Sequence, residues 1–151
     1  MPDQTFVYVT YIRTTPDKLW EALTKPEFTR RYWFGSHQQS DWTVGSSWKL
    51  AFADGRVADT GEVLEIDPPK RLVLKWRNEF RPELKSEGYT RCTFEIETEG
   101  EMVKLTVIHE ADRPNKLIDA VSAGWPRVLS SLKSLLETGE GLPRTDSLPK
   151  G

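Results

Sequence analysis

The sequence predicts an α+β fold in which a curved antiparallel sheet of about six strands wraps around one long C-terminal helix, with two short helices after the first strand. Two observations carry this prediction. Residues 47–109 alternate between apolar and polar positions in short segments separated by turn residues, as strands with one buried face do. Residues 117–135 instead repeat apolar side chains every three or four positions, as an amphipathic helix does.

The N-terminal segment predicts the first strand and the two short helices. Residues 5–12 are rich in aromatic and β-branched residues, which favour a strand. Thr15 is a hydroxyl N-cap followed by a proline at the first helical position, so a helix is expected to begin there. Pro26 breaks that helix, and residues 27–33 predict a second one. Residues 35–45 are polar and without a clear period, which predicts a loop.

The middle of the chain predicts a run of consecutive strands. Asp54 and Gly55 form a hairpin-type turn after the first of them, and residues 80–88 form a charged loop. Because consecutive strands joined by short turns usually pair with each other, we expect an antiparallel meander. The expected strands cover residues 47–52, 57–66, 72–77, 89–98 and 103–109.

The C-terminal helix shows the strongest periodicity in the chain. Pro114 is expected in its first turn, and Gly139 and Gly141 are expected to end it. Pro126 lies inside the helix and predicts a kink, because proline removes one backbone hydrogen bond. Only this helix is long enough to cover the apolar face of the sheet. The sheet must therefore curl around it, and the space left over is a candidate binding cavity.

Length and composition limit the classes of partner. The 151 residues predict a single domain over residues 1–141 and a flexible polar tail over residues 142–151. The net charge of −2 and the lack of a basic block argue against nucleic acid, and the lack of a long apolar run or anchor argues against a membrane. The lone Cys92 suits a reducing compartment, so the cytoplasm is expected.

The sequence resembles a known superfamily over about residues 5–138, through the segments YIRTTPDKLWEALT (11–24), RYWFG (31–35), GEVLEIDPPKRL (61–72) and the pair Gly124-Trp125. It resembles the START-related SRPBCC superfamily, and more narrowly the branch named after the C-terminal domain of the activator of heat-shock-90 ATPase. This resemblance implies a helix-grip fold with a hydrophobic pocket under the long helix, and a link to the stress response through the chaperone. It implies no single activity, since the superfamily includes carriers, receptors and cyclases.

Six tryptophans raise the aromatic content to 11%, which fits either a core filled by large rings or a cavity walled by them. Both interpretations stay open for each ring. If a cavity exists, its expected lining comes from three places. A lid beside the polar loop holds Trp33, Phe34 and Trp42. The concave strand faces hold Trp48, Phe52, Leu74, Trp76, Phe94, Leu105, Val107 and His109, and the helix holds Val121, Trp125 and Val128.

His109 is the one candidate for catalysis. It extends an apolar strand face, so it is expected to point inward near Glu110, where it could hold a polar ligand group or act as an acid or base. The alternative is a histidine hydrogen-bonded to a backbone carbonyl at the edge of the sheet. Together with His37 and Cys92 it forms no metal-binding spacing, so neither a metal nor a cofactor is expected.

Three functions remain open at this point. The first is binding of a small hydrophobic or aromatic ligand in the cavity, with a carrier or sensing role. The second is an enzyme of the cyclase or hydrolase type that uses His109 with a neighbouring carboxylate. The third is an interaction module for a chaperone or for a second copy in a homodimer, which would be marked by an exposed apolar patch.

Overall fold

The computed structural model describes residues 4–113 and 115–143. It confirms the predicted α+β class, with seven strands in the described part of the chain rather than about six. The predictions for Pro114 and for most of the tail, residues 144–151, lie outside the described residues. In chain order the elements are β1 (Gln4–Ile12), α1 (Pro16–Thr24), α2 (Pro26–Tyr32), β2 (His37–Ser40), β3 (Ser47–Ala51), β4 (Val57–Asp67), β5 (Arg71–Asn78), α3 (Pro82–Lys85), β6 (Thr90–Glu99), β7 (Met102–Ala111) and α4 (Lys116–Thr138).

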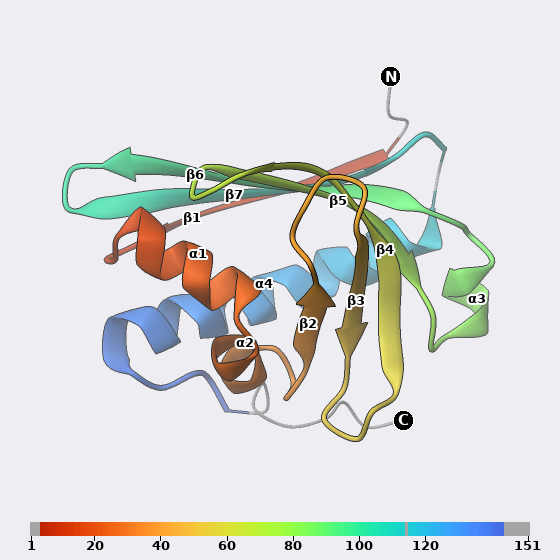
Figure 1. The fold of residues 1–151 in the computed structure, drawn as a ribbon, viewed down its shortest axis with the longest axis horizontal. Coiled ribbons are helices and arrows are strands. Elements are labelled where there is room, and N and C mark those ends of the chain that lie inside the picture. Colours follow the sequence, from red (N-terminus) through yellow and green to blue (C-terminus); the bar gives the residue numbers. More distant parts are fainter. Residues whose placement is uncertain (1–3, 114, 144–151) are drawn as a thin grey trace.

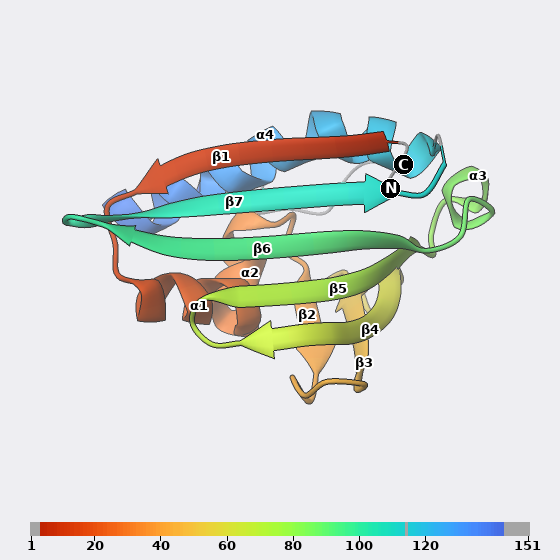
Figure 2. The same ribbon diagram turned by 90° about the horizontal axis from the view of Figure 1, so that it is seen from above.

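The strands form one sheet in the order β1-β7-β6-β5-β4-β3-β2, and every neighbouring pair is antiparallel. Figure 2 shows β1, β7, β6 and β5 running side by side, while β4, β3 and β2 turn away below them. Figure 1 shows the result of this bend: α1, α2 and α4 lie on the inner side of the curve. The predicted helix-grip arrangement is therefore confirmed.

Both ends of α4 are set by residues with the expected capping chemistry. The Asn115 side chain is the N-cap and accepts a hydrogen bond of 2.8 Å from the backbone N–H of Leu117. Gly139 ends the helix in the left-handed region with φ 89°, a conformation that costs glycine little. The helix is assigned without a break from Lys116 to Thr138, with Pro126 inside it. Its buried face therefore extends along the concave side of the sheet.

The prediction that residues 35–45 form a loop is wrong where β2 lies. This strand has no apolar alternation, because its inward residue is the polar Gln38. The Gln38 amide donates to the backbone oxygen of Leu23 and accepts a 2.8 Å hydrogen bond from the Trp48 indole N–H. With both amide atoms paired, the side chain can be buried without a large penalty. The short α3 likewise lies in the predicted loop 80–88, where one helical turn buries Leu84.

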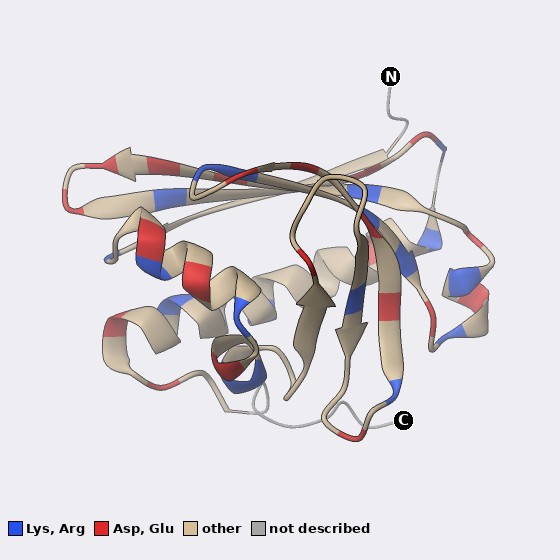
Figure 3. Ribbon diagram, viewed as in Figure 1, with Lys and Arg blue, Asp and Glu red and all other residues tan. Residues whose placement is uncertain are grey.

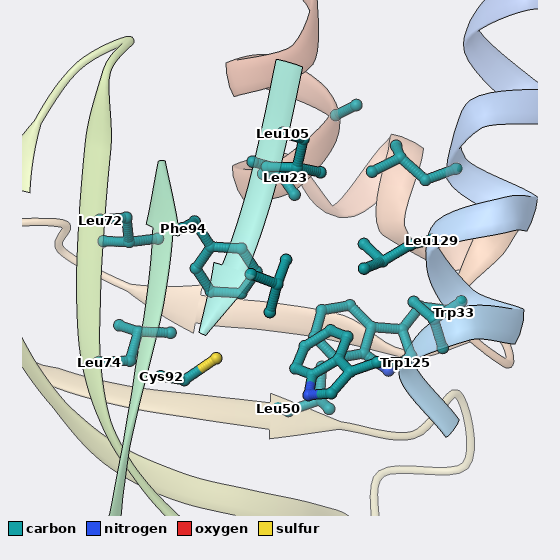
Figure 4. Close-up of a cluster of buried hydrophobic side chains, with 14 of the residues drawn as sticks. Leu23, Trp33, Leu50, Leu72, Leu74, Cys92, Phe94, Leu105, Trp125 and Leu129 are labelled. Atoms are coloured by element: carbon teal, nitrogen blue, oxygen red, sulfur yellow. The ribbon is translucent and has the colours of Figure 1, made fainter. Parts of the chain in front are cut away.

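The core lies between the sheet and α4. Figure 4 shows Leu72, Cys92 and Phe94 on the sheet side, facing Leu129 and other residues on the helix side. Cys92 is fully buried, and burial raises the pKa of its thiol well above the ordinary value. A thiol in that state is a poor nucleophile, as expected for a packing residue.

Gly61 brings two indoles together at the middle of the bent part of the sheet. It pairs with Trp48 on one side and with Trp76 on the other. A Cβ atom at this position would lie 1.6 Å from the backbone oxygen of Lys75, so no other residue fits without a backbone shift. The rings of Trp48 and Trp76 pack over this strand with centroids 4.4 Å apart. Trp76 is thereby fixed where it borders the site described below.

Charged side chains of both signs are interspersed over the ribbon in Figure 3. Their ion pairs are mostly exposed, such as Arg56 with Asp54 at 2.8 Å and Arg81 with Glu83 at 2.9 Å. Exposed pairs of this kind contribute little to stability. None of the helices in residues 4–113 and 115–143 combines the length and the apolar character that crossing a membrane requires.

Candidate functional site

A pocket of about 180 Å³ lies between the first half of α4, the strands β3 to β5 and the short helix α3. Its walls are mainly apolar, with three polar side chains among them. Such a combination is typical of small-molecule sites. The lining residues are Trp33, Phe34, Leu50, Asp59, Trp76, Asn78, Phe80, Arg81, Leu84, Leu117, Ala120, Val121, Gly124, Trp125 and Val128.

Three indole rings from different elements meet at this pocket. Trp33 follows α2, Trp76 lies on β5 and Trp125 lies on α4. The Trp33 ring centroid lies 6.0 Å from that of Trp76 and 5.4 Å from that of Trp125, and the last two are 5.7 Å apart. Figure 4 shows Trp33 and Trp125 next to each other beside α4, with Leu50 close by. Each ring is held by the other two, so this wall is stiff.

The backbone at the edge of the pocket has an unusual conformation. Phe34 has φ 52°, in the left-handed region that aromatic residues rarely adopt, and Gly35 follows with φ 71°. Non-glycine residues in this region cost of order 1 kcal/mol or more and often occur at binding sites. The strain here directs the chain from α2 into β2 and leaves Phe34 in the pocket wall.

Asp59 is a buried acidic residue in this pocket wall. It sits on β4 between Leu50 of β3 and Asn78 of β5 in one row across the sheet. The Trp76 indole N–H donates a 3.0 Å hydrogen bond to Asp59 Oδ1. Burial raises the pKa of the Asp59 carboxyl from 3.8 to about 7, with a further contribution from the negative charge of Glu79. Near neutral pH this carboxyl is therefore partly protonated.

Glu79, next to the pocket, is held ionised by three donors. It accepts hydrogen bonds from Thr60 Oγ1 at 2.8 Å and Arg77 Nε at 2.5 Å, and Lys85 Nζ lies 3.3 Å away. Burial pushes the pKa of the Glu79 carboxyl upward, but these donors outweigh burial and the net shift is downward. The pocket thus has a fixed negative charge close to the titrating Asp59.

His109 lies behind the pocket wall, and both of its ring nitrogens have partners. The Trp125 indole N–H donates to Nδ1 at 3.2 Å, and Nε2 lies 2.7 Å from the hydroxyl of Thr90. That hydroxyl in turn donates to the backbone oxygen of Trp76 at 3.1 Å. These directions assign the proton to Nε2, so the ring is neutral. Burial agrees with this, because it lowers the pKa of His109 to about 3.

The sequence-predicted site residues divide into two groups in the structure. Trp33, Phe34, Trp76, Val121, Trp125 and Val128 come together in the pocket wall. A ligand-binding role for them stays a prediction. The structure does not bring the others to this pocket: Trp42 is half-buried in the loop after β2, while Trp48, Phe52, Leu74, Phe94, Leu105, Val107 and His109 are buried elsewhere in the interior.

Several lining residues were missed by the sequence analysis. Asp59 could have been found, because it shares the inward phase of β4 with Gly61 and Val63. An acidic residue at an inward strand position is a signal for a site. The remaining residues gave no periodic signal that sets them apart from core or loop; they are Leu50, Asn78, Phe80, Arg81, Leu84, Leu117, Ala120 and Gly124.

One protein-family model matches the chain. The family model described as "Activator of Hsp90 ATPase homolog 1-like protein" matches residues 13–137, which is most of the chain. No match was found among curated proteins.

Solved structures show the same fold. Protein MLL2253 from Mesorhizobium loti is 25% identical, with a TM-score of 0.74, over 88% of this chain and 96% of that one. The Aha1 dimer from Colwellia psychrerythraea is 22% identical, with a TM-score of 0.72, over 91% and 99%. PFC0360w, an HSP90 activator from Plasmodium falciparum, is 24% identical, with a TM-score of 0.70, over 87% and 95%.

Proposed function

Since this chain belongs to the family of activator of Hsp90 ATPase homolog 1-like proteins, we propose that it uses the pocket under α4 to bind a small hydrophobic or aromatic molecule. Its role would be that of a carrier or sensor in the cytoplasm. The observation that carries the proposal is an unfilled volume of about 180 Å³ bordered by three indole rings. The pocket is concave, mainly apolar and partly open to solvent, as small-molecule sites commonly are.

The volume limits the size of the ligand. An engineered protein cavity of about 150 Å³ with an apolar lining binds benzene. The pocket of about 180 Å³ is therefore expected to hold one aromatic ring with a short substituent.

Gly124 is the lining residue that leaves the most room on the α4 side of the pocket. It lies in the middle of α4, where glycine is less favourable than alanine by about 1 kcal/mol. A Cβ atom at this position would meet no atom within 4 Å, so alanine would fit. The glycine borders the pocket next to Trp125. Its presence in the helix is explained if the free space is needed by a bound molecule.

A Gly124→Leu variant is expected to bind ligand at least tenfold more weakly than the unmodified protein, because its side chain would occupy part of the pocket. Its thermal stability should be equal or higher, since leucine favours the helix. The measurement is a tryptophan fluorescence titration with benzyl alcohol, together with a melting curve. Ala123→Leu is the matched control, because the exposed Ala123 is the neighbouring residue and does not line the pocket. Equal loss of affinity in both variants, or none in Gly124→Leu, would contradict the assignment.

The geometry gives less support to an enzyme based on His109. The histidine does not line the pocket, and Trp125 and Thr90 occupy its two ring nitrogens. A general acid or base must reach the proton that it transfers. We therefore assign His109 a positioning role: it holds the Trp125 indole in the pocket wall.

A second candidate function is association with another copy of the chain. On the edge strand β1, Val7, Val9 and Tyr11 are 54%, 43% and 42% exposed, and Met102 nearby is 41% exposed. Tyr11 and Met102 border one surface groove. Apolar side chains gathered at a sheet edge favour contact with a partner. The similar protein from Colwellia psychrerythraea is described as a dimer, and the one from Plasmodium falciparum as an HSP90 activator.

Val9→Lys is expected to shift the protein toward monomer, because it places a charge in the middle of the apolar strip on β1. Sedimentation velocity over a wide concentration range measures this. The ligand affinity of the variant should stay unchanged. Val9 is on the edge strand β1, whereas the strands that line the pocket are β3 to β5, and Val9 is absent from the lining. If the unmodified protein stays monomeric at every concentration, self-association is ruled out as a function. The proposed ligand binding would not be affected by that result.

A further inference from the structure

We propose that the pocket selects cations: its ligand is a small ammonium compound with an aromatic or apolar substituent, with Asp59 as the counter-ion and the indoles of Trp33, Trp76 and Trp125 around it. This inference rests on the proposed ligand-binding function and names the class of ligand. Three observations carry it, namely a carboxyl oxygen that faces the pocket, the local balance of charge and the aromatic walls.

One oxygen of Asp59 is available to a ligand. In residues 4–113 and 115–143, the single hydrogen bond to the Asp59 carboxyl goes from Trp76 Nε1 to Oδ1. Oδ2 accepts no hydrogen bond in these residues. It also keeps some solvent exposure, because it is not one of their fully buried atoms that lack a hydrogen-bond partner. Asp59 is 6% exposed and lines the pocket. The remaining exposure of this side chain therefore faces the pocket, where a ligand could donate to Oδ2.

The charges around Asp59 leave it without a cation of its own. Glu79 acts on it through space and makes the surroundings more negative. Arg77 and Lys85 are paired with that same Glu79. Arg81, the cation in the pocket wall, is paired with Glu83 at 2.9 Å. An unpaired buried carboxylate is costly, so a cationic ligand would stabilise the ionised form.

The other walls favour the same class of ligand. The faces of aromatic rings attract cations within about 6 Å of the ring centroid, and indole attracts them most strongly. Trp33, Trp76 and Trp125 border the pocket together, with centroid separations of 5.4 to 6.0 Å. The lining residues from α4 and β3 carry no charge. Of the two charged lining residues, Arg81 is paired with Glu83, so an anionic ligand would face the Asp59 carboxyl and is therefore disfavoured.

The test compares three ligands that share one ring and differ in charge: benzylamine, benzyl alcohol and benzoate. Isothermal titration calorimetry at pH 8 is carried out on the unmodified protein and on Asp59→Asn. We expect the unmodified protein to bind benzylamine at least tenfold more tightly than benzyl alcohol, and benzoate most weakly. In Asp59→Asn the preference for benzylamine over benzyl alcohol should fall to within about threefold.

A second measurement uses only the unmodified protein. Its affinity for benzylamine should rise between pH 6 and pH 8 as Asp59 ionises, while its affinity for benzyl alcohol stays flat or falls. Binding of benzyl alcohol without a preference for benzylamine would overturn the cation assignment and leave the proposed function intact. Tighter binding of benzoate, or a preference that survives in Asp59→Asn, would also overturn it. Failure of all three ligands to bind would overturn the proposed function itself.

Discussion

Replacing His109 with leucine is expected to lower the free energy of unfolding by about 3 kcal/mol at pH 7. The ring accepts from the Trp125 indole and donates to Thr90 in a fully buried position. Leucine has a similar size but leaves the buried Trp125 indole N–H without a partner, at about 1–3 kcal/mol, and removes one of the two hydrogen bonds of the Thr90 hydroxyl, at about 1 kcal/mol. Glutamine has both a donor and an acceptor, so His109→Gln should recover part of the loss. Urea denaturation of the three proteins measures the differences.

The effect of His109→Leu should depend on pH in a defined direction. The folded-state pKa of His109 is lowered from 6.5 to about 3, so its neutral form stabilises the fold above pH 6.5. As the pH falls below 6.5 the unfolded chain takes up the proton first, and this stability is lost by about 1.4 kcal/mol per pH unit. The difference between unmodified protein and variant should therefore be about 2 kcal/mol smaller at pH 5 than at pH 7. A difference that grows at pH 5 would contradict the neutral assignment.

The Asp59→Asn variant is expected to be more stable than the unmodified protein by about 4 kcal/mol at pH 8, and about equally stable at pH 3. Folding raises the pKa of Asp59 from 3.8 to about 7, so the folded protein keeps a proton that the unfolded chain releases in this range. Stability is therefore lost as the pH rises from 3.8 to 7, by about 1.4 kcal/mol per unit. Asparagine has the shape of the protonated acid and can still accept from Trp76.

Denaturation of both proteins at several pH values measures this gain. Equal stability at pH 8 would show that Asp59 ionises without cost and that its surroundings differ from those described. A residue that destabilises the folded protein at neutral pH is typical of a functional site, where stability and activity oppose each other. The pH effects of Asp59 and His109 have opposite signs between pH 3.8 and pH 6.5. In the unmodified protein they partly cancel, so each becomes visible in the variant that lacks it.

The periodic parts of the chain were predictable from the sequence because each has one buried apolar face. This holds for α4 and for the strands β3 to β7, whose bounds differ by few residues from those expected. The strand β2 was not predicted, because its inward residue is the polar Gln38 and not an apolar side chain. The hydrogen-bond partners of Gln38, Leu23 and Trp48, are remote from it in the sequence. The helix α3 was not predicted, because a single turn of helix has no period to detect.

The site was predictable only in part, for a physical reason. Alternation identifies which side chains point inward, but it does not say which of them leave space between them. Trp76 and Leu74 share one face of β5, yet Trp76 borders the pocket and Leu74 is fully packed in the core. The position of the pocket depends on how far α4 and α3 lie from the bent end of the sheet. That distance arises from the packing of the whole domain.

The most direct test of ligand binding at this site is a two-dimensional ¹H–¹⁵N NMR titration that follows the six tryptophan indole N–H signals with benzyl alcohol or benzylamine. Trp33, Trp76 and Trp125 border the pocket, so their signals should shift in a saturable way with one common dissociation constant. Trp20 and Trp42 lie outside its lining and should move little. Shifts confined to Trp20 and Trp42, or no shift at saturating ligand, would contradict a binding pocket under α4.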